Sequence, residues 1–272
     1  MTRLESIFHR LRQEGRGGLV TFTTAGDPDL DRSTDILLAL DRGGADVLEV
    51  GVPFSDPMAD GPTIQRASER ALRAGGSLSA ALTIIGGIRS KIAAGVVVFS
   101  YANPLLAMGL ERFAARAAAS GVDGVLIVDV PVEEAGPIRE ALSRVGIDTI
   151  FLLSPTTTDA RIAKAAALGG GFLYGISRLG VTGARETVAP GAAALVRRIR
   201  ARTSLPIALG FGLSRPEHVA EVTAFADAAV VGSALVSLVA QHADESTLTD
   251  RLEAYVRSLK GACAHANAPG RS

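Results

Sequence analysis

Short apolar runs alternate with helix-length segments along almost the whole of this 272-residue chain. Eight of the runs have the length of strands, at 19–24, 46–51, 96–100, 124–128, 148–153, 171–175, 206–210 and 227–232. They lack a clean alternation of apolar and polar residues, which is typical of parallel strands buried on both faces of a sheet. Eight strand–helix units in about 250 residues predict a closed (β/α)8 barrel of the TIM type. A doubly wound open sheet is the competing prediction.

The two ends of the chain differ from this repeating part. Before the first strand, apolar residues recur at helical spacing at Leu4, Ile7, Phe8 and Leu11. They predict an extra N-terminal amphipathic helix over 1–14, with one face to bury. Residues 262–272 are expected to form a frayed tail. Because no linker or low-complexity segment interrupts the alternation, the whole of 1–272 is predicted to be one barrel domain.

The composition excludes several classes of protein. Basic and acidic residues balance at 28 each, so the net charge gives no general attraction to nucleic acid or to an anionic membrane. The single cysteine, Cys263, and the four scattered histidines show no ligand spacing, so neither a disulfide nor a bound metal is expected. No apolar run reaches the ~20 residues of a membrane span, and the charged N-terminus is unlike a secretory signal. A cytoplasmic protein is therefore expected.

Glu49 is an unusual residue for its position, because it lies within the apolar run 46–51. An unpaired buried charge is costly. Directly after this run comes a stiff, proline-rich loop that carries Asp56 and Asp60. Since barrels place their active sites at the carboxyl ends of the strands, this strand and loop can present two carboxyl groups to one substrate. The alternative is that Glu49 is a satisfied core acid and that the two aspartates are ordinary turn residues.

Later loops indicate a lid and a phosphate site. The longest loop, 176–190, follows the sixth strand and carries Thr182 between glycines, which predicts a lid; the alternative is a mobile surface loop. The loops after the seventh and eighth strands contain glycines, and barrels often bind phosphate at these loops. Neutral donors at Gly183, Gly212 and Ser233 would bind it without a lysine. The sequence therefore predicts a phosphorylated small-molecule ligand.

Seven motifs follow one another along the chain. The longest, LEVGVPFSDPMADGPTIQ, covers 48–65. The others are TAGDP (24–28), YANP (101–104), DVP (129–131), SRLGVTG (177–183), GFG (210–212) and VGS (231–233). In this order, and over roughly residues 1 to 260, the chain resembles the tryptophan synthase alpha chain family.

The resemblance implies a lyase that cleaves indole-3-glycerol phosphate to indole and D-glyceraldehyde 3-phosphate by a retro-aldol reaction, with no cofactor. In the family, the Glu that matches Glu49 is the general acid–base at indole C3 and the glycerol hydroxyl. The Asp that matches Asp60 interacts with the indole N–H and stabilises positive charge on the ring. The remaining substrate-binding residues that the resemblance implies are Phe22, Tyr174 and Thr182 around the pocket, and Gly183, Gly212, Gly232 and Ser233 at the phosphate.

The resemblance also implies a partner. In the family, a beta chain that uses pyridoxal phosphate (PLP) takes the indole through a tunnel and joins it to serine, within an alpha2beta2 heterotetramer. The contact would come from loop two (53–60), loop three (101–106) and the turn at 129–131. The interface residues carried over in this way are Pro53, Asp56, Pro57, Tyr101, Asn103, Asp129 and Pro131.

Three other functions share part of this pattern. A stand-alone indole-3-glycerol phosphate lyase would keep every catalytic residue and would differ by its activity without a partner. Another phosphate-binding barrel of the same pathway, an isomerase or a synthase, would not need Asp60 beside Glu49. A silent, phosphosugar-sensing barrel would bind the ligand without turning it over, and would only activate its partner.

Overall fold

The computed structural model describes residues 1–176, 191–210 and 212–263. The strands are β1 (Gly18–Thr24), β2 (Val47–Gly51), β3 (Gly95–Ser100), β4 (Gly124–Ile127), β5 (Asp148–Ile150), β6 (Leu152–Leu153), β7 (Leu173–Ile176), β8 (Ile207–Gly210) and β9 (Ala228–Val231). The helices are α1 (Arg3–Gln13), α2 (Leu30–Arg42), α3 (Pro62–Arg73), α4 (Leu78–Ile88), the 3₁₀ turn η1 (Arg89–Lys91), α5 (Ala102–Met108), α6 (Leu110–Ala119), α7 (Gly136–Ser143), α8 (Asp159–Leu168), α9 (Ala192–Arg200), α10 (Pro216–Thr223), α11 (Ser233–Gln241) and α12 (Leu248–Gly261).

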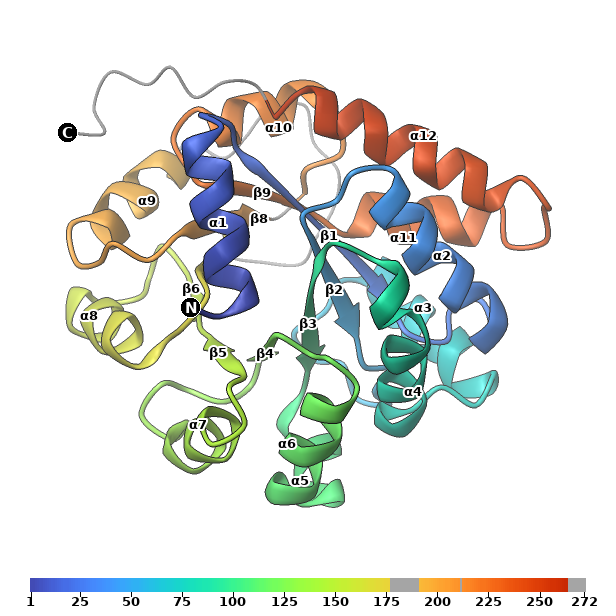
Figure 1. Cartoon of the computed structure of the whole chain (residues 1–272), viewed down its shortest axis with the longest axis horizontal. Coiled ribbons are helices and arrows are strands. Elements are labelled where there is room, and N and C mark those ends of the chain that lie inside the picture. Colours follow the sequence, from blue (N-terminus) through green and yellow to red (C-terminus); the bar gives the residue numbers. More distant parts are fainter. Residues whose placement is uncertain (177–190, 211, 264–272) are drawn as a thin grey trace.

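The strands form a nearly closed barrel with the helices outside (Figure 1). Neighbouring strands are parallel, in the order β5-β4-β3-β2-β1-β9-β8-β7-β6. The two strands at the ends of this order are consecutive parts of the predicted fifth run, separated only by Phe151. The carbonyl of Phe151 accepts a hydrogen bond from the N–H of Tyr174 on β7 at 3.0 Å. The prediction of a (β/α)8 barrel is therefore confirmed, and the open sheet is excluded.

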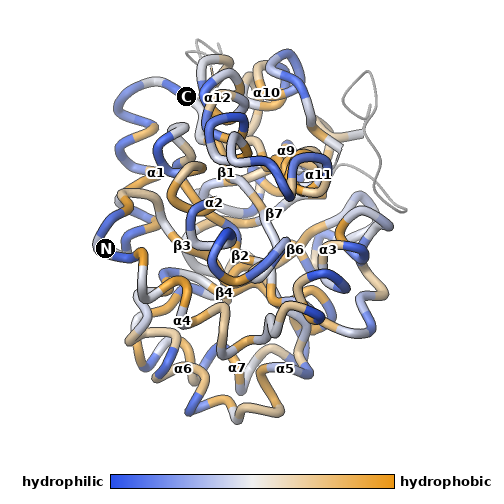
Figure 2. Tube along the Cα trace, turned by 90° about the vertical axis from the view of Figure 1, so that its right-hand side faces the viewer, coloured by the Kyte–Doolittle hydropathy of each residue, from blue (hydrophilic) through white to orange (hydrophobic). Residues whose placement is uncertain are grey.

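Side chains along each strand alternate between the barrel interior and the surrounding helices. On β2, Leu48 and Val50 are fully buried against the helices, whereas Val47 packs among the interior residues. Side chains two residues apart lie on the same face of a strand, so Glu49 also points into the interior. Figure 2 shows hydrophobic and hydrophilic residues interspersed along the outer helices. On α2, for example, Ile36 and Leu40 are buried whereas Asp35 is exposed, as expected for an amphipathic helix that buries one face.

Helix α1 closes the end of the barrel at which the strands begin. The side chain of Thr2 accepts a hydrogen bond from the N–H of Glu5, and the Glu5 carboxylate accepts one from the N–H of Thr2, which forms a capping box. The predicted apolar face of α1 is buried against the interior strands, and the rings of Phe8 and Phe172 lie 5.5 Å apart. A functional site is therefore left to the opposite end, where the strands terminate.

Two predicted boundaries need correction. Most of the predicted loop three, 101–106, is helix, because α5 begins directly after Tyr101. The carboxylate of Asp129 accepts a hydrogen bond from the N–H of Ala102 at 2.8 Å, which stabilises this helix start. The predicted tail begins two residues too early, because Cys263 is only 5% exposed and packs in the core. The rest of that tail, 264–272, lies outside the described residues.

Within the described part of the chain, no group of three or more His, Cys, Asp or Glu side chains could hold a metal ion. No single described helix is long and apolar enough to cross a membrane. Among the described helices, one pair passes the length and composition test together, α3 with the segment Leu78–Lys91, and this pair is bent by 88° at the intervening turn.

Candidate active site

Glu49 lies near the carboxyl end of β2, in register with Phe22 on β1 and Val97 on β3. Its side chain is 1% exposed. Among the described residues, neither oxygen of its carboxyl group has a hydrogen-bond partner. A buried acid with a structural role normally has its polar atoms satisfied. Among the described residues, Glu49 is therefore not a satisfied core acid, and its carboxyl group is a candidate for a functional role.

Burial controls the protonation of Glu49. Removal from water disfavours the charged form and raises the pKa of Glu49 to about 8. At neutral pH the group therefore carries its proton in most molecules of the free protein. A carboxyl group with a pKa this close to neutrality is suited both to donating a proton and to accepting one.

Aromatic side chains form the walls around Glu49. The rings of Phe22 and Phe99 meet edge to face, with their centroids 5.2 Å apart. Tyr174 on β7 is buried, and the pKa of its hydroxyl is raised well above the usual value by desolvation and by the charge of Glu49. The two groups therefore lie within electrostatic reach of one another. Apolar aromatic walls beside one carboxyl group suit a flat, largely apolar ligand with a single polar position.

Asp60 is held in place by its side chain and by its backbone. Its carboxylate accepts a hydrogen bond from the hydroxyl of Tyr101 at 3.0 Å, and that hydroxyl also accepts one from the N–H of Ala59 at 3.0 Å. On α3, the amide of Gln65 donates a hydrogen bond to the carbonyl of Asp60 at 2.9 Å. Burial raises the pKa of Asp60, whereas the hydrogen bond from Tyr101 lowers it. Asp60 is thus a fixed carboxylate and not an ordinary turn residue.

The residues predicted to contact a partner lie in two environments. Asp56, Asn103, Asp129 and Pro131 are exposed, and Pro57 is half-buried. Pro53 and Tyr101 are buried, and the ring of Tyr101 stacks on Phe54 at a centroid distance of 5.0 Å. The described contacts of Tyr101 thus join the end of β3 to loop two. For all seven residues, contact with a partner stays a prediction.

The two loops that are predicted to bind phosphate follow β8 and β9. Gly212 has a φ of 79°, in the left-handed region that favours glycine. Gly232 precedes α11, which begins at Ser233, and no side chain of the described residues caps that helix. The N–H groups of its first turn are therefore available to an anion. The predicted donors Thr182 and Gly183 lie outside the described residues.

The sequence matches known proteins along nearly its full length. Residues 8–264 match the family model of the tryptophan synthase alpha chain. The chain belongs to the tryptophan synthase alpha chain family. Tryptophan synthase alpha chains from Solibacter usitatus and Burkholderia multivorans are 48% and 45% identical to it, over 96% of this chain and 97% of each relative. The resemblance carried by the motifs is confirmed.

Solved structures of the tryptophan synthase family share the fold. Tryptophan synthase subunit alpha from Legionella pneumophila has a TM-score of 0.89 at 33% identity, over 97% of this chain and 98% of that one. A structure of Mycobacterium tuberculosis tryptophan synthase also has a TM-score of 0.89, at 35% identity, over 96% of this chain and 98% of the matched one. The barrel of this chain is thus the barrel of the alpha chain family.

Two glycines to which the sequence analysis assigns no role also contact the aromatic walls of the site. A Cβ atom on Gly51 would lie 2.6 Å from the ring of Phe22, and one on Gly210 would lie 2.7 Å from the hydroxyl oxygen of Tyr174. Any other residue at these positions would displace an aromatic wall of the site. The only signal in the sequence is that each glycine ends a strand on the interior face.

Proposed function

We propose that Glu49 and Asp60 carry out the alpha reaction of tryptophan synthase, the retro-aldol cleavage of indole-3-glycerol phosphate to indole and D-glyceraldehyde 3-phosphate. Membership of the family makes the chain a lyase. The observation that carries the assignment of the residues is the buried, unpartnered carboxyl group of Glu49 between aromatic walls. The silent-barrel alternative gives no reason to maintain such a group, because a buried unsatisfied acid destabilises the fold.

The proposed reaction uses Glu49 first as an acid and then as a base, so that two different protons pass through its carboxyl group. Glu49 donates its proton to C3 of the indole ring, and the positive charge that forms on the ring is stabilised by the carboxylate of Asp60 near the indole nitrogen. Glu49 then accepts the proton of the adjacent glycerol hydroxyl. The bond between C3 and the glycerol carbon breaks, its electrons return to the ring, and the hydroxyl carbon becomes the aldehyde. Glu49 ends protonated, as it began.

The remaining proposed residues bind the two ends of the substrate. Phe22 and Tyr174 would contact the indole ring, with Thr182 contributed by the loop at 176–190. The phosphate would accept hydrogen bonds from the N–H groups at Gly183, Gly212, Gly232 and Ser233. The first turn of α11, which no described side chain caps, supports this placement. A Cβ on Gly232 would lie 3.3 Å from the Cβ of Phe22, so the proposed phosphate and ring sites adjoin.

The pH dependence of the reaction should report Glu49. We expect kcat/KM for indole release to fall as the pH rises above about 8, because the free protein must carry the proton of Glu49 and burial raises the pKa of that group to about 8. Measuring kcat/KM from about pH 6 to about pH 10 tests this. Tyr174 cannot cause the decline, because the pKa of its hydroxyl lies well above the usual value. A profile that stays level through pH 8 would rule out Glu49 as the acid.

The proposed partner is a tryptophan synthase beta chain, in an alpha2beta2 complex in which PLP belongs to the beta chain and the cleavage itself needs no cofactor. The exposed predicted interface residues lie at the end of the barrel that holds the site. Two large apolar side chains are also exposed there, Met58 in loop two at 85% and Leu106 on α5 at 57%. Exposed apolar groups of this size are typical of a surface that a partner covers.

Indole release by the purified chain, with and without the beta chain, tests the proposed function. We expect slow release by the chain alone and much faster release with the beta chain. Equally fast release by the chain alone would favour the stand-alone lyase. Binding of indole-3-glycerol phosphate with no release in either assay would favour the silent, ligand-sensing barrel.

A further inference from the structure

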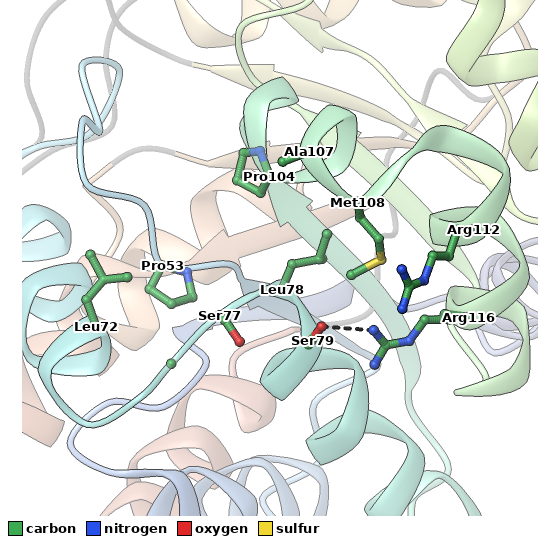
Figure 3. A pocket seen from close by; sticks show the side chains of 11 residues that line it. Pro53, Leu72, Ser77, Leu78, Ser79, Pro104, Ala107, Met108, Arg112 and Arg116 are labelled. Atoms are coloured by element: carbon green, nitrogen blue, oxygen red, sulfur yellow. Dashed lines mark hydrogen bonds between the residues drawn. The ribbon is translucent and has the colours of Figure 1, made fainter.

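A groove with a volume of about 410 Å³ lies between the turn that joins α3 to α4 and the helices α5 and α6 (Figure 3). Its lining is apolar at Pro53, Leu78, Pro104 and Met108. Along one side, α6 contributes two basic residues, Arg112 and Arg116, and we call this feature the arginine groove. Nothing in the proposed cleavage reaction uses it.

The described lining of the arginine groove carries two positive charges and no carboxylate. The guanidinium of Arg116 donates a hydrogen bond to the hydroxyl of Ser79 at 2.8 Å. Among the described residues, neither Arg112 nor Arg116 forms an ion pair, and no Asp or Glu lines the groove. By contrast, Arg161, which lines another pocket beside Glu133, pairs with that carboxylate at 3.0 Å. The two guanidinium groups are thus able to accept an acidic group from outside the chain.

The arginine groove is continuous with the surface that we propose the beta chain covers. Pro53 begins loop two, and Pro104 lies in the first turn of α5, next to the predicted interface residue Asn103. Of the five large apolar side chains that are exposed in the described residues, three lie on the elements around the groove: Met58, Leu72 and Leu106. A partner that covers these side chains would also cover the groove.

We propose that the arginine groove binds an acidic segment of the beta chain, with a carboxylate of that segment paired to Arg112 or Arg116. Covering a guanidinium removes it from water, and an unpaired buried charge strongly disfavours a complex. A segment that fills this groove must therefore bring a carboxylate to the arginine side and apolar groups to the side of Leu78 and Met108. The proposal rests on the proposed function, which supplies the partner.

The test is the affinity of the full-length chain for the beta chain, measured for the unaltered protein, Arg112→Glu and Arg116→Glu. We expect each charge reversal to raise Kd about tenfold or more, because truncating or reversing one member of an interfacial charge pair strongly weakens binding. Arg112→Lys keeps the charge and should stay within about threefold of the unaltered protein. Arg12→Glu makes the same charge change on an exposed residue of α1, at the opposite end of the barrel, and should leave Kd unchanged.

The outcomes separate this proposal from the proposed function. All variants should retain the slow indole release of the isolated chain, which shows that they are folded. If the unaltered chain binds the beta chain and both reversals bind equally well, the groove proposal is wrong and the proposed function stands. If the unaltered chain does not bind the beta chain at all, the groove proposal and the proposed alpha2beta2 complex both fail, whereas the cleavage by Glu49 and Asp60 is decided separately by indole release. If the isolated chain is a dimer that Arg112→Glu dissociates, the occupant is a second copy and the proposal is overturned.

Discussion

Replacing Glu49 by glutamine should lower kcat for indole release by at least about 10²-fold and leave the affinity for indole-3-glycerol phosphate nearly unchanged. Glutamine has the size of glutamate, so the aromatic walls keep their positions. Its amide cannot donate an acidic proton to indole C3 and cannot accept the glycerol proton. Steady-state kinetics together with a direct binding measurement separate the two effects. A variant that keeps more than about a tenth of the rate would contradict the assignment of Glu49 as general acid–base.

The Glu49→Gln variant should also differ from the unaltered chain in its free energy of unfolding. The pKa of Glu49 is raised from 4.5 to about 8, so between these values the folded protein binds more protons than the unfolded chain. The contribution of this group to the free energy of unfolding therefore decreases as the pH rises through that window, by up to about 1.4 kcal/mol per pH unit. Glutamine is neutral at every pH. The variant should thus gain stability relative to the unaltered chain between about pH 6 and about pH 8.

Thermal unfolding of both proteins across that pH range provides the measurement, and it doubles as a test of folding. If Glu49 is a functional buried acid, the glutamine variant should lose activity and gain stability above neutral pH. A constant difference in stability across the range would mean that the Glu49 carboxylate has a charged or hydrogen-bonding partner in solution.

The fold could be predicted from the sequence because the alternation of apolar runs and helix-length segments is repeated along the chain. Each of the eight apolar runs corresponds to a strand, the fifth being divided into β5 and β6, and the apolar positions 4, 7, 8 and 11 form the buried face of α1. Glu49 was also accessible, because a carboxyl group in a fully apolar strand conflicts with its surroundings. The spacing of apolar residues, and a charged residue within an apolar run, can both be recognised from neighbouring residues in the sequence without knowledge of the tertiary structure.

The contacts that fix Asp60 were not accessible in this way. Tyr101 lies 41 positions from Asp60 in the sequence, and its hydroxyl reaches the carboxylate only because β2 and β3 are neighbours in the barrel. The sequence predicts a loop where the structure has α5. The first turn of this helix is stabilised by Asp129, which follows β4 and is distant in the sequence, so no local pattern reveals the contact. The space that Gly210 leaves for Tyr174 depends on two strands packing side by side. Such long-range contacts leave no local pattern.

Replacing Asp60 by asparagine should lower kcat by about 10²- to 10³-fold with little change in KM, as expected when one group that stabilises charge in the transition state is removed. The amide oxygen of asparagine can still accept the hydrogen bond from Tyr101, so loop two should keep its position while the charge near the indole nitrogen is lost. Steady-state kinetics of indole release, with the beta chain present, give both constants.

Tyr101→Phe is the matched control, because it removes the hydroxyl that binds Asp60 but keeps the charge of Asp60 and the ring that stacks on Phe54. Its effect on kcat should be about tenfold, smaller than that of Asp60→Asn, since positioning is weakened while the charge remains. Because the hydrogen bond from Tyr101 lowers the pKa of Asp60, this variant should also move the acidic limb of the pH profile upward. If Tyr101→Phe proved as damaging as Asp60→Asn and left the pH profile unchanged, the hydroxyl would matter for the shape of loop two, and the charge of Asp60 would not be what accelerates the reaction.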